Sequence, residues 1–163
     1  MMIADPLAFA ADYLDASLRL TLPLSFAALG GLMSERSGIL NIGLEGMLLT
    51  GAFAAAVGAV FTDQAVIGVL AGAIAGCLLG LLHAALCVTL AVNQLVSGLA
   101  INLTAAGLTA YGARLLFDSG TVALPRLTAI AIPGLSSLPV VGVVFHQNWM
   151  VYSLLALIPL LTY

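Results

Sequence analysis

Long uncharged stretches of apolar residues, separated by short polar segments, make up most of the chain. A helix needs about 20 mostly apolar residues to cross about 30 Å of hydrocarbon at about 1.5 Å per residue. Residues 64–113 carry no formal charge apart from any proton on His83. As one helix they would be about 75 Å long, so they must fold back once, and the polar pair Asn93-Gln94 marks the turn. The pattern predicts helices over about residues 17–34, 46–62, 64–90 and 93–116.

Charged residues set the expected ends of the first two helices. Arg19, near the start of the first helix, reaches back to the headgroups, and the helix ends before Glu35 and Arg36. The second helix starts within residues 41–46 and closes at Asp63.

The segment after the fourth predicted helix has a different composition. It contains three prolines, which break helices, at positions 125, 133 and 139. Turn-forming residues lie between the second and the third of them. We therefore expect a long external loop over residues 119–148. Trp149, a residue type typical of the membrane interface, then opens an apolar run to Tyr163 that stops about five residues short of a span.

These elements together predict an all-α fold, a polytopic transmembrane helical bundle with about four complete spans and a truncated fifth. We expect residues 1–163 to form a single transmembrane domain, truncated at its C-terminus, within a longer membrane protein. A fifth helix shortened by a dipping terminus is the alternative. Acidic residues precede the first basic one, Arg19, so no cleaved leader is expected.

Composition excludes a soluble globular domain. Hydrophobic residues make up 63% of the chain and charged residues 7%, with a mean hydropathy of +1.21, whereas soluble domains are about one quarter charged. The net charge of −3 and the scattered arginines make nucleic acid an unsuitable partner. Cys77 and Cys87 lack any metal-like spacing, so we expect them to be small buried apolar residues, neither ligands nor nucleophiles.

A polar segment, residues 34–46, joins the first two predicted helices. It is too polar for the interior of a span and too apolar for a free loop. Asn41 is suited to cap a helix start, which would place Glu45 in the first turn, where the helix dipole favours an anion. A half-helix entering the membrane near residues 38–46 fits this pattern and would line a solute path, because irregular backbone at membrane depth needs protein or water around it. An ordinary interfacial turn is the alternative.

The fourth predicted helix has a polar side near its start. Asn93 is a candidate N-cap, and at about 100° per residue four residues fall on one side: Gln94, Ser97, Gly98 and Asn102. Polar side chains in hydrocarbon turn inward. They would either contact a polar solute or hydrogen-bond to other helices. His83, alone in the third helix, is interpreted as a packing residue with a hydrogen-bond partner rather than as a proton relay.

Small residues recur every four positions in the third predicted helix, at Gly68, Gly72, Gly76 and Gly80. Such a ridge lets another helix approach closely where lipid provides no hydrophobic drive for association. The second helix has a matching row at positions 51, 55 and 59. The rows predict tight helix–helix packing, with static packing favoured over a sliding seam of a moving transporter.

Two long motifs resemble a known family. The string ERSGILNIGLEGM at residues 35–47, followed by TGAF at 50–53, resembles a signature of the inner-membrane permeases of bacterial ABC importers, and most of all of their nucleoside and simple-sugar branch. NQLVSGLAINL at residues 93–103 resembles that branch's second signature. Residues 132–142, from IPGL to PVVG, resemble its proline-containing external loop.

The resemblance implies a multi-pass protein of the bacterial inner membrane that lines a solute pathway together with a second permease subunit. It also implies ABC ATPase subunits, which carry ATP and Mg, and an extracytoplasmic solute-binding lipoprotein. No cofactor is expected on this chain, which has no Lys for a phosphate-binding loop. By the same resemblance the 118–148 loop is extracytoplasmic. The pathway candidates are Asn41, Glu45, Asn93, Gln94, Ser97 and Asn102.

Other functions remain alternatives at this point. A simple-sugar or branched-chain amino-acid permease would carry a different solute through the same kind of bundle, and a small non-transporting membrane subunit would explain the length directly. Half of a secondary transporter would need a coupling-ion site, which the sequence does not reveal. An enzyme is least favoured, because the sequence supports no pair of nucleophile and base.

Overall fold

The structure, a computed structural model, describes residues 5–117, 122–134 and 140–162. Within these residues, helices dominate and one short two-stranded sheet forms. The elements in chain order are α1 (Pro6–Arg36), α2 (Leu44–Thr62), α3 (Ala65–Ala84), a π-helical turn (Ala85–Thr89), α4 (Gln94–Phe117), β1 (Ala129–Ala131), a 3-10 turn (Val141–Phe145), β2 (His146–Asn148) and α5 (Trp149–Thr162).

Four helices in the described part of the chain are long and apolar enough to cross a membrane. They are α1, α2, α3 continued through its π-helical turn, and α4, while α5 is a shorter apolar helix of 14 residues. This confirms the predicted all-α, multi-pass membrane bundle.

The helix ends follow local signals. The predicted fold-back at Asn93 is confirmed. The π-helical turn that continues α3 ends at Thr89, and α4 begins at Gln94. The side-chain Oδ1 of Asn93 accepts the N–H groups of Leu95 and Val96 at 2.9 and 3.3 Å, which is the predicted N-cap.

The prediction for the first helix was wrong at both ends. α1 starts at Pro6, where Oδ1 of Asp5 accepts the Leu7 N–H at 2.9 Å, and it runs through Arg36. It ends because Gly38 adopts φ +79°, with its N–H donating to Glu35 O at 2.9 Å. This is the glycine-terminated helix end of the Schellman type. Charge at a membrane surface limits the span but does not stop a helix.

The described chain forms two compact units. The terminal unit comprises Met1–Leu29 and Thr128–Tyr163, and the central unit comprises Gly30–Leu127. In the terminal unit, Leu22 of α1 packs against Val151 and Leu154 of α5. The strands β1 and β2 pair antiparallel, with Ile130 opposite Gln147, inside the predicted external loop. Residues 119–121 and 135–139 of that loop lie outside the described residues.

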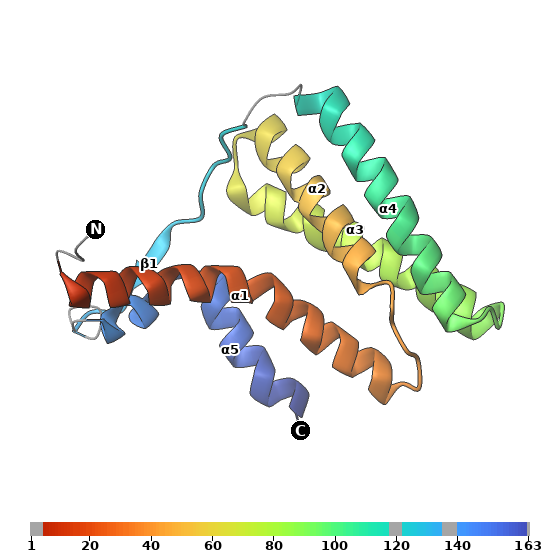
Figure 1. The fold of residues 1–163 in the computed structure, drawn as a ribbon, viewed down its shortest axis with the longest axis horizontal. Helices are drawn as coiled ribbons and strands as arrows, with labels where there is room; N and C mark the ends of the chain where they lie inside the picture. The colour runs from red at the N-terminus through yellow and green to blue at the C-terminus, as the bar shows by residue number, and fades with distance from the viewer. Residues whose placement is uncertain (1–4, 118–121, 135–139, 163) are drawn as a thin grey trace. The chain divides into compact units, whose positions relative to one another are not determined.

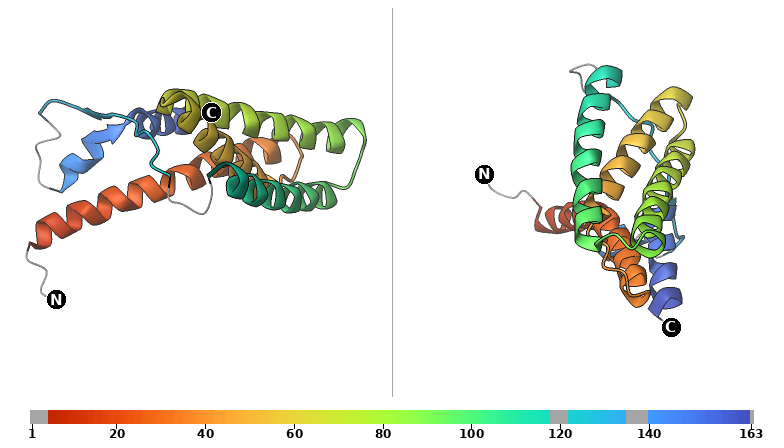
Figure 2. Two further views of the ribbon diagram at one scale, coloured as in Figure 1. Left: turned by 90° about the horizontal axis from the view of Figure 1, so that it is seen from above. Right: turned by 90° about the vertical axis from the view of Figure 1, so that its right-hand side faces the viewer.

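The central unit is built on three helices that lie side by side (Figures 1 and 2). α2 and α3 form an antiparallel hairpin through a turn at Asp63, which adopts the left-handed conformation with φ 52°. α4 packs mainly against α2. This arrangement brings the two polar motifs of the sequence together, since one precedes α2 and the other opens α4.

Most large apolar side chains of these helices are exposed in the chain, among them Leu70, Leu78 and Leu103. Cys77 is exposed as well, so its predicted burial was wrong, while Cys87 is partly buried; both are free thiols. In a membrane an apolar side chain is removed from water by lipid, so hydropathy does not predict contact with protein.

Candidate functional site

The connection between α1 and α2, residues 37–43, consists of turns and irregular backbone. The half-helix expected near residues 38–46 is not formed as a separate element, because helical structure starts only at Leu44 and then continues as α2. The residue that caps α2 is Gly43, which has no side chain with which to bind the first-turn N–H groups. Partners for this backbone must come from elsewhere.

Asn102 of α4 supplies two of these partners. Its Oδ1 accepts the N–H of Gly46, in the first turn of α2, at 2.7 Å, and its Nδ2 donates to the carbonyl of Ile42 at 3.0 Å. A helix usually receives this bond from its own N-cap residue. Here a side chain of another helix takes the role of the cap.

Gln94, two helical turns before Asn102, holds the beginning of the same connection. Its Oε1 accepts the N–H of Leu40 at 2.7 Å, and its Nε2 lies 3.5 Å from the carbonyl oxygen of Gly38, to which it donates a long hydrogen bond. Both amide side chains of α4 are therefore engaged by backbone groups of the connection and of the first turn of α2.

Gly98 lies between the two amides on the same side of α4. A Cβ at this position would lie 2.8 Å from the Gly43 nitrogen and 3.0 Å from Ile42 Cβ, which no real Cβ tolerates without movement. At Gly46 an added Cβ would lie 2.9 Å from both Asn102 Oδ1 and the Ile101 carbonyl oxygen. The backbones of α4 and the connection thus touch directly, which is the use of glycine at such crossings.

Asn41 does not cap α2 as predicted. Its Oδ1 accepts the N–H of Gly43 at 3.1 Å, a local turn of the Asx type, and its Nδ2 lies 3.6 Å from the Met47 sulfur. Glu45 does lie in the first turn of α2, as expected, and its side chain is exposed. Of the four predicted pathway residues at the connection, Asn41, Gln94 and Asn102 are partly buried and Glu45 is exposed.

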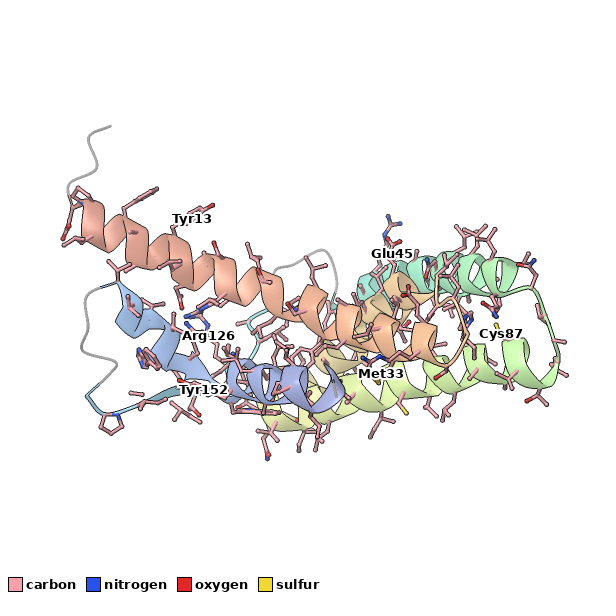
Figure 3. All side chains as sticks on the ribbon, turned by 90° about the horizontal axis from the view of Figure 1, so that it is seen from below. Tyr13, Met33, Glu45, Cys87, Arg126 and Tyr152 are labelled. Carbon is pink, nitrogen blue, oxygen red and sulfur yellow. The ribbon has the colours of Figure 1, made fainter. Side chains whose placement is uncertain are left out.

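Ser97 belongs to a different contact from its neighbours on α4. Its hydroxyl lies 3.0 Å from Nδ1 of His83, and both residues are almost completely buried, with 3% and 2% of their surface exposed. The Cys87 sulfur lies 3.8 Å from both ring nitrogens, and Figure 3 shows Cys87 between α3 and α4. His83 thus has the hydrogen-bond partner that the packing interpretation required.

A cavity of about 450 Å³ opens between α2, α3 and α4. Leucine, isoleucine and alanine residues form most of its wall, with Phe53 from α2, and the hydroxyl-bearing residues that also line it are Thr50, Ser97, Thr104 and Thr109. Its lining is mainly apolar, and Thr109 directs its hydroxyl to the Ala105 carbonyl of its own helix at 2.7 Å. Among the described residues, no three His, Cys, Asp or Glu gather where they could hold a metal ion.

The glycine ridge of α3 contacts α2 over half of its length. A Cβ at Gly68 would lie 2.7 Å from the Ala55 carbonyl oxygen, and one at Gly72 would lie 2.7 Å from that of Gly51. At Gly76 the nearest atom, the Met47 carbonyl oxygen, is 3.8 Å away, and Gly80 has open space. The two helices are therefore in backbone contact near their shared turn and diverge towards the other end.

Comparison with known proteins identifies the family of this chain. Residues 13–162 match the family described as the branched-chain amino acid transport system / permease component. The chain belongs to this permease family. No solved structure gives a significant match.

Three curated relatives match this family member over most of its length. The guanosine ABC transporter permease protein NupQ of Bacillus subtilis is 38% identical over 150 residues, which cover 87% of this chain and 47% of NupQ. The nucleoside ABC transporter permease protein NupC of Lactococcus lactis is 33% identical over 143 residues, 83% of this chain and 45% of NupC. A protein of Haloferax volcanii provisionally named a glucose ABC transporter permease, TsgC13, is 34% identical over 144 residues, 87% of this chain and 44% of that protein.

These relatives are named as transporter permeases and not as enzymes. The chain spans a little under half of their length, between 44% and 47%. Together with the four apolar helices, the family places this permease chain in the membrane as a multi-pass protein.

The terminal unit of this permease chain contains a polar cluster that sequence reasoning missed. Gln147, with 2% of its surface exposed, donates from Nε2 to Asp15 Oδ1 at 2.7 Å and to the Val143 carbonyl at 3.0 Å. Asp15 also pairs with Arg19 at 2.8 Å. The partners Asp15 and Gln147 are 132 positions apart. In the sequence, Gln147 is the single Gln of residues 119–148, which could have marked it as a candidate for burial. The sequence does not show that Asp15 is its partner.

Proposed function

We propose that the chain is the permease subunit of an ATP-binding-cassette importer and lines the pathway of a nucleoside or a related small polar solute. The observation that carries the proposal is the 38% identity to a guanosine permease over 87% of the chain. A second relative is named for nucleosides. Four helices long and apolar enough to cross a membrane fit a multi-pass subunit.

The central unit offers a rationale for a polar solute. An irregular segment between two spans is sustained only where protein or a water-filled cavity satisfies its backbone. Here the amides of α4 do so, and they are not free to bind the solute at the same time. We therefore propose Glu45, exposed on the first turn of α2, as the solute contact, with Asn41, Asn93, Gln94, Ser97 and Asn102 shaping the wall behind it.

The proposal includes partners. Two ATPase subunits would bind ATP and Mg and hydrolyse ATP, a second permease subunit would complete the pathway, and an extracytoplasmic binding lipoprotein would deliver the solute. This chain would bind no cofactor itself.

Uptake into vesicles tests the proposal. Reconstituted vesicles carrying the full-length gene product and its partner subunits, with ATP enclosed on the ATPase side, would receive labelled guanosine and the binding protein on the outer side. We expect uptake that stops with a non-hydrolysable ATP analogue or with an ATPase subunit unable to hydrolyse ATP. Uptake that persists under both conditions, or that follows an ion gradient, would contradict it.

The glucose name of the Haloferax relative favours a second solute class, simple sugars. Competition separates the two classes. An excess of unlabelled ribonucleosides should abolish labelled guanosine uptake, while glucose and branched-chain amino acids should leave it unchanged. If glucose competes and nucleosides do not, the permease is a sugar permease. If no solute is taken up by a fully assembled complex, the non-transporting subunit becomes the better hypothesis.

A further inference from the structure

We propose that Gln94 and Asn102 are positioning residues that keep the α1–α2 connection and the first turn of α2 fixed to α4 as one body during transport. The effect on transport that we expect rests on the proposed function. The effect on hydrogen exchange does not. The two amides and Gly98 are called the clamp below.

The clamp holds the connection at both of its ends. Gln94 binds the Gly38 carbonyl and the Leu40 N–H, and Asn102 binds the Ile42 carbonyl and the Gly46 N–H. The two side chains are eight residues apart, which is about 12 Å along a helix. Two attachments at that separation prevent the connection from pivoting about either one.

Gly98 fixes the register between the two attachments. The connection passes so close to α4 that even a Cβ at Gly98 would lie 2.8 Å from the Gly43 nitrogen. Sliding α4 by one turn would bring the side chain of Gln94 or Asn102 into the space that Gly98 leaves. The contact therefore allows one register and does not act as a sliding seam.

Asn102 is committed to this role by the chemistry of its partners. The N–H of Gly46 lies in a buried residue at the start of a helix whose own cap residue, Gly43, has no side chain. If Asn102 turned towards a solute, this N–H and the Ile42 carbonyl would lose their protein partners in a region where water is scarce. A group that binds the solute must be free to exchange partners, and Asn102 is not. The partners of Gln94 lie in the exposed residues Gly38 and Leu40, so Gln94 is held by its two hydrogen bonds alone.

Hydrogen exchange of the full-length protein in lipid nanodiscs tests the clamp directly. Asn102→Leu should speed exchange of the Gly46 amide, and Gln94→Leu that of the Leu40 amide, by about tenfold or more, without changing exchange within α3. Thr104→Val also replaces a polar side chain of α4 by an apolar one, at a position beside the cavity. It should leave the exchange of residues 38–46 at the wild-type rate. Unchanged exchange in both leucine variants would overturn the proposal.

A conservative variant guards against misfolding. Asn102→Asp keeps an oxygen for the Gly46 N–H but places a second oxygen against the Ile42 carbonyl. We expect the Gly46 amide to remain slow in exchange in this variant and faster in Asn102→Leu. If Asn102→Leu yields no folded protein, the exchange of the Leu40 amide in Gln94→Leu decides.

Transport separates positioning from solute contact. In the clamp variants the maximal uptake rate should fall about fivefold or more, while the apparent KM and the ratio of uptake between two different nucleosides stay at wild-type values. A changed ratio would assign Gln94 or Asn102 to the solute and overturn the proposal. A wild-type protein that imports no nucleoside would refute the proposed function alone, since the exchange measurement would still judge the clamp.

Discussion

Asn102 of α4 caps a helix to which it does not belong, because its Oδ1 accepts the N–H of Gly46 in the first turn of α2 at 2.7 Å. The cap residue of α2 itself, Gly43, contributes no side chain. The stability of the start of α2 therefore depends on the position of α4. This dependence makes the central unit sensitive to small changes on one side of α4.

Gly98→Ala should destabilise the central unit. The added Cβ would meet the Gly43 nitrogen at 2.8 Å and force α4 away from the connection, and overpacking of this kind costs about 1–3 kcal/mol. Thermal unfolding of the purified full-length protein in detergent would show a lower midpoint. Gly107→Ala, on the same helix with open space around it, is the matched control and should unfold at or slightly above the wild-type temperature. Equal midpoints for the two variants would show that α4 does not touch the connection.

The α2–α3 hairpin should distinguish between glycines of the same ridge. Gly72→Ala places a Cβ 2.7 Å from the Gly51 carbonyl oxygen, so it should lower the unfolding midpoint, again by a loss of about 1–3 kcal/mol. Gly80→Ala meets nothing within 4 Å and should be neutral or stabilising. The same thermal measurement compares them. A destabilising Gly80→Ala would mean that a partner outside the described chain covers that end of α3.

The buried pair of His83 and Ser97 should contribute to holding α3 and α4 together. Ser97→Ala removes the hydroxyl 3.0 Å from Nδ1, leaving the ring the more distant Cys87 sulfur at 3.8 Å. We expect a loss of about 1 kcal/mol, the usual scale for an interhelical hydrogen bond in a membrane protein. Thr109→Val removes a buried hydroxyl that bonds only within its own helix, to the carbonyls of Ala105 and Ala106, and should cost less. A double-mutant cycle with His83→Phe measures the pair, and a coupling energy near zero would show that the two side chains do not interact.

Gln147 should be important for the terminal unit. Gln147→Leu leaves the Val143 carbonyl without its side-chain donor and Asp15 with Arg19 alone, which should cost about 1–3 kcal/mol. Limited proteolysis of the full-length protein would then cut the 129–148 loop faster. His146→Gln, at the exposed neighbouring position, is the control and should keep the wild-type rate. If both variants are cut at the wild-type rate, the contact with Asp15 does not secure the loop.

The helix boundaries show where local reasoning succeeds. The turn at Asn93 and the start of α4 were predicted correctly, because a capping side chain next to an apolar run is a local signal. The ends of α1 were missed although the sequence contained equally local signals, Asp5-Pro6 and Gly38. The charges at positions 35 and 36 lie within the last turn of α1, and Gly38 terminates the helix.

The side-chain partners show where local reasoning fails. The sequence placed Gln94, Ser97 and Asn102 on one side of a helix, but the structure divides them between the α1–α2 connection and His83. Partners of Gln94 and Asn102 lie 54 to 60 positions away along the chain. No periodicity within α4 carries that information.

The sequence by itself determined that the chain is a multi-pass helical membrane protein, where its second, third and fourth spans lie, and which family it resembles. It could do so because the exclusion of charge from hydrocarbon and the length of a span act on each segment separately. Only the tertiary structure decided that the α4 amides serve backbone and leave Glu45 exposed. Hydrogen bonds between helices depend on how the helices cross and in what register, and that is a property of the packed helices together.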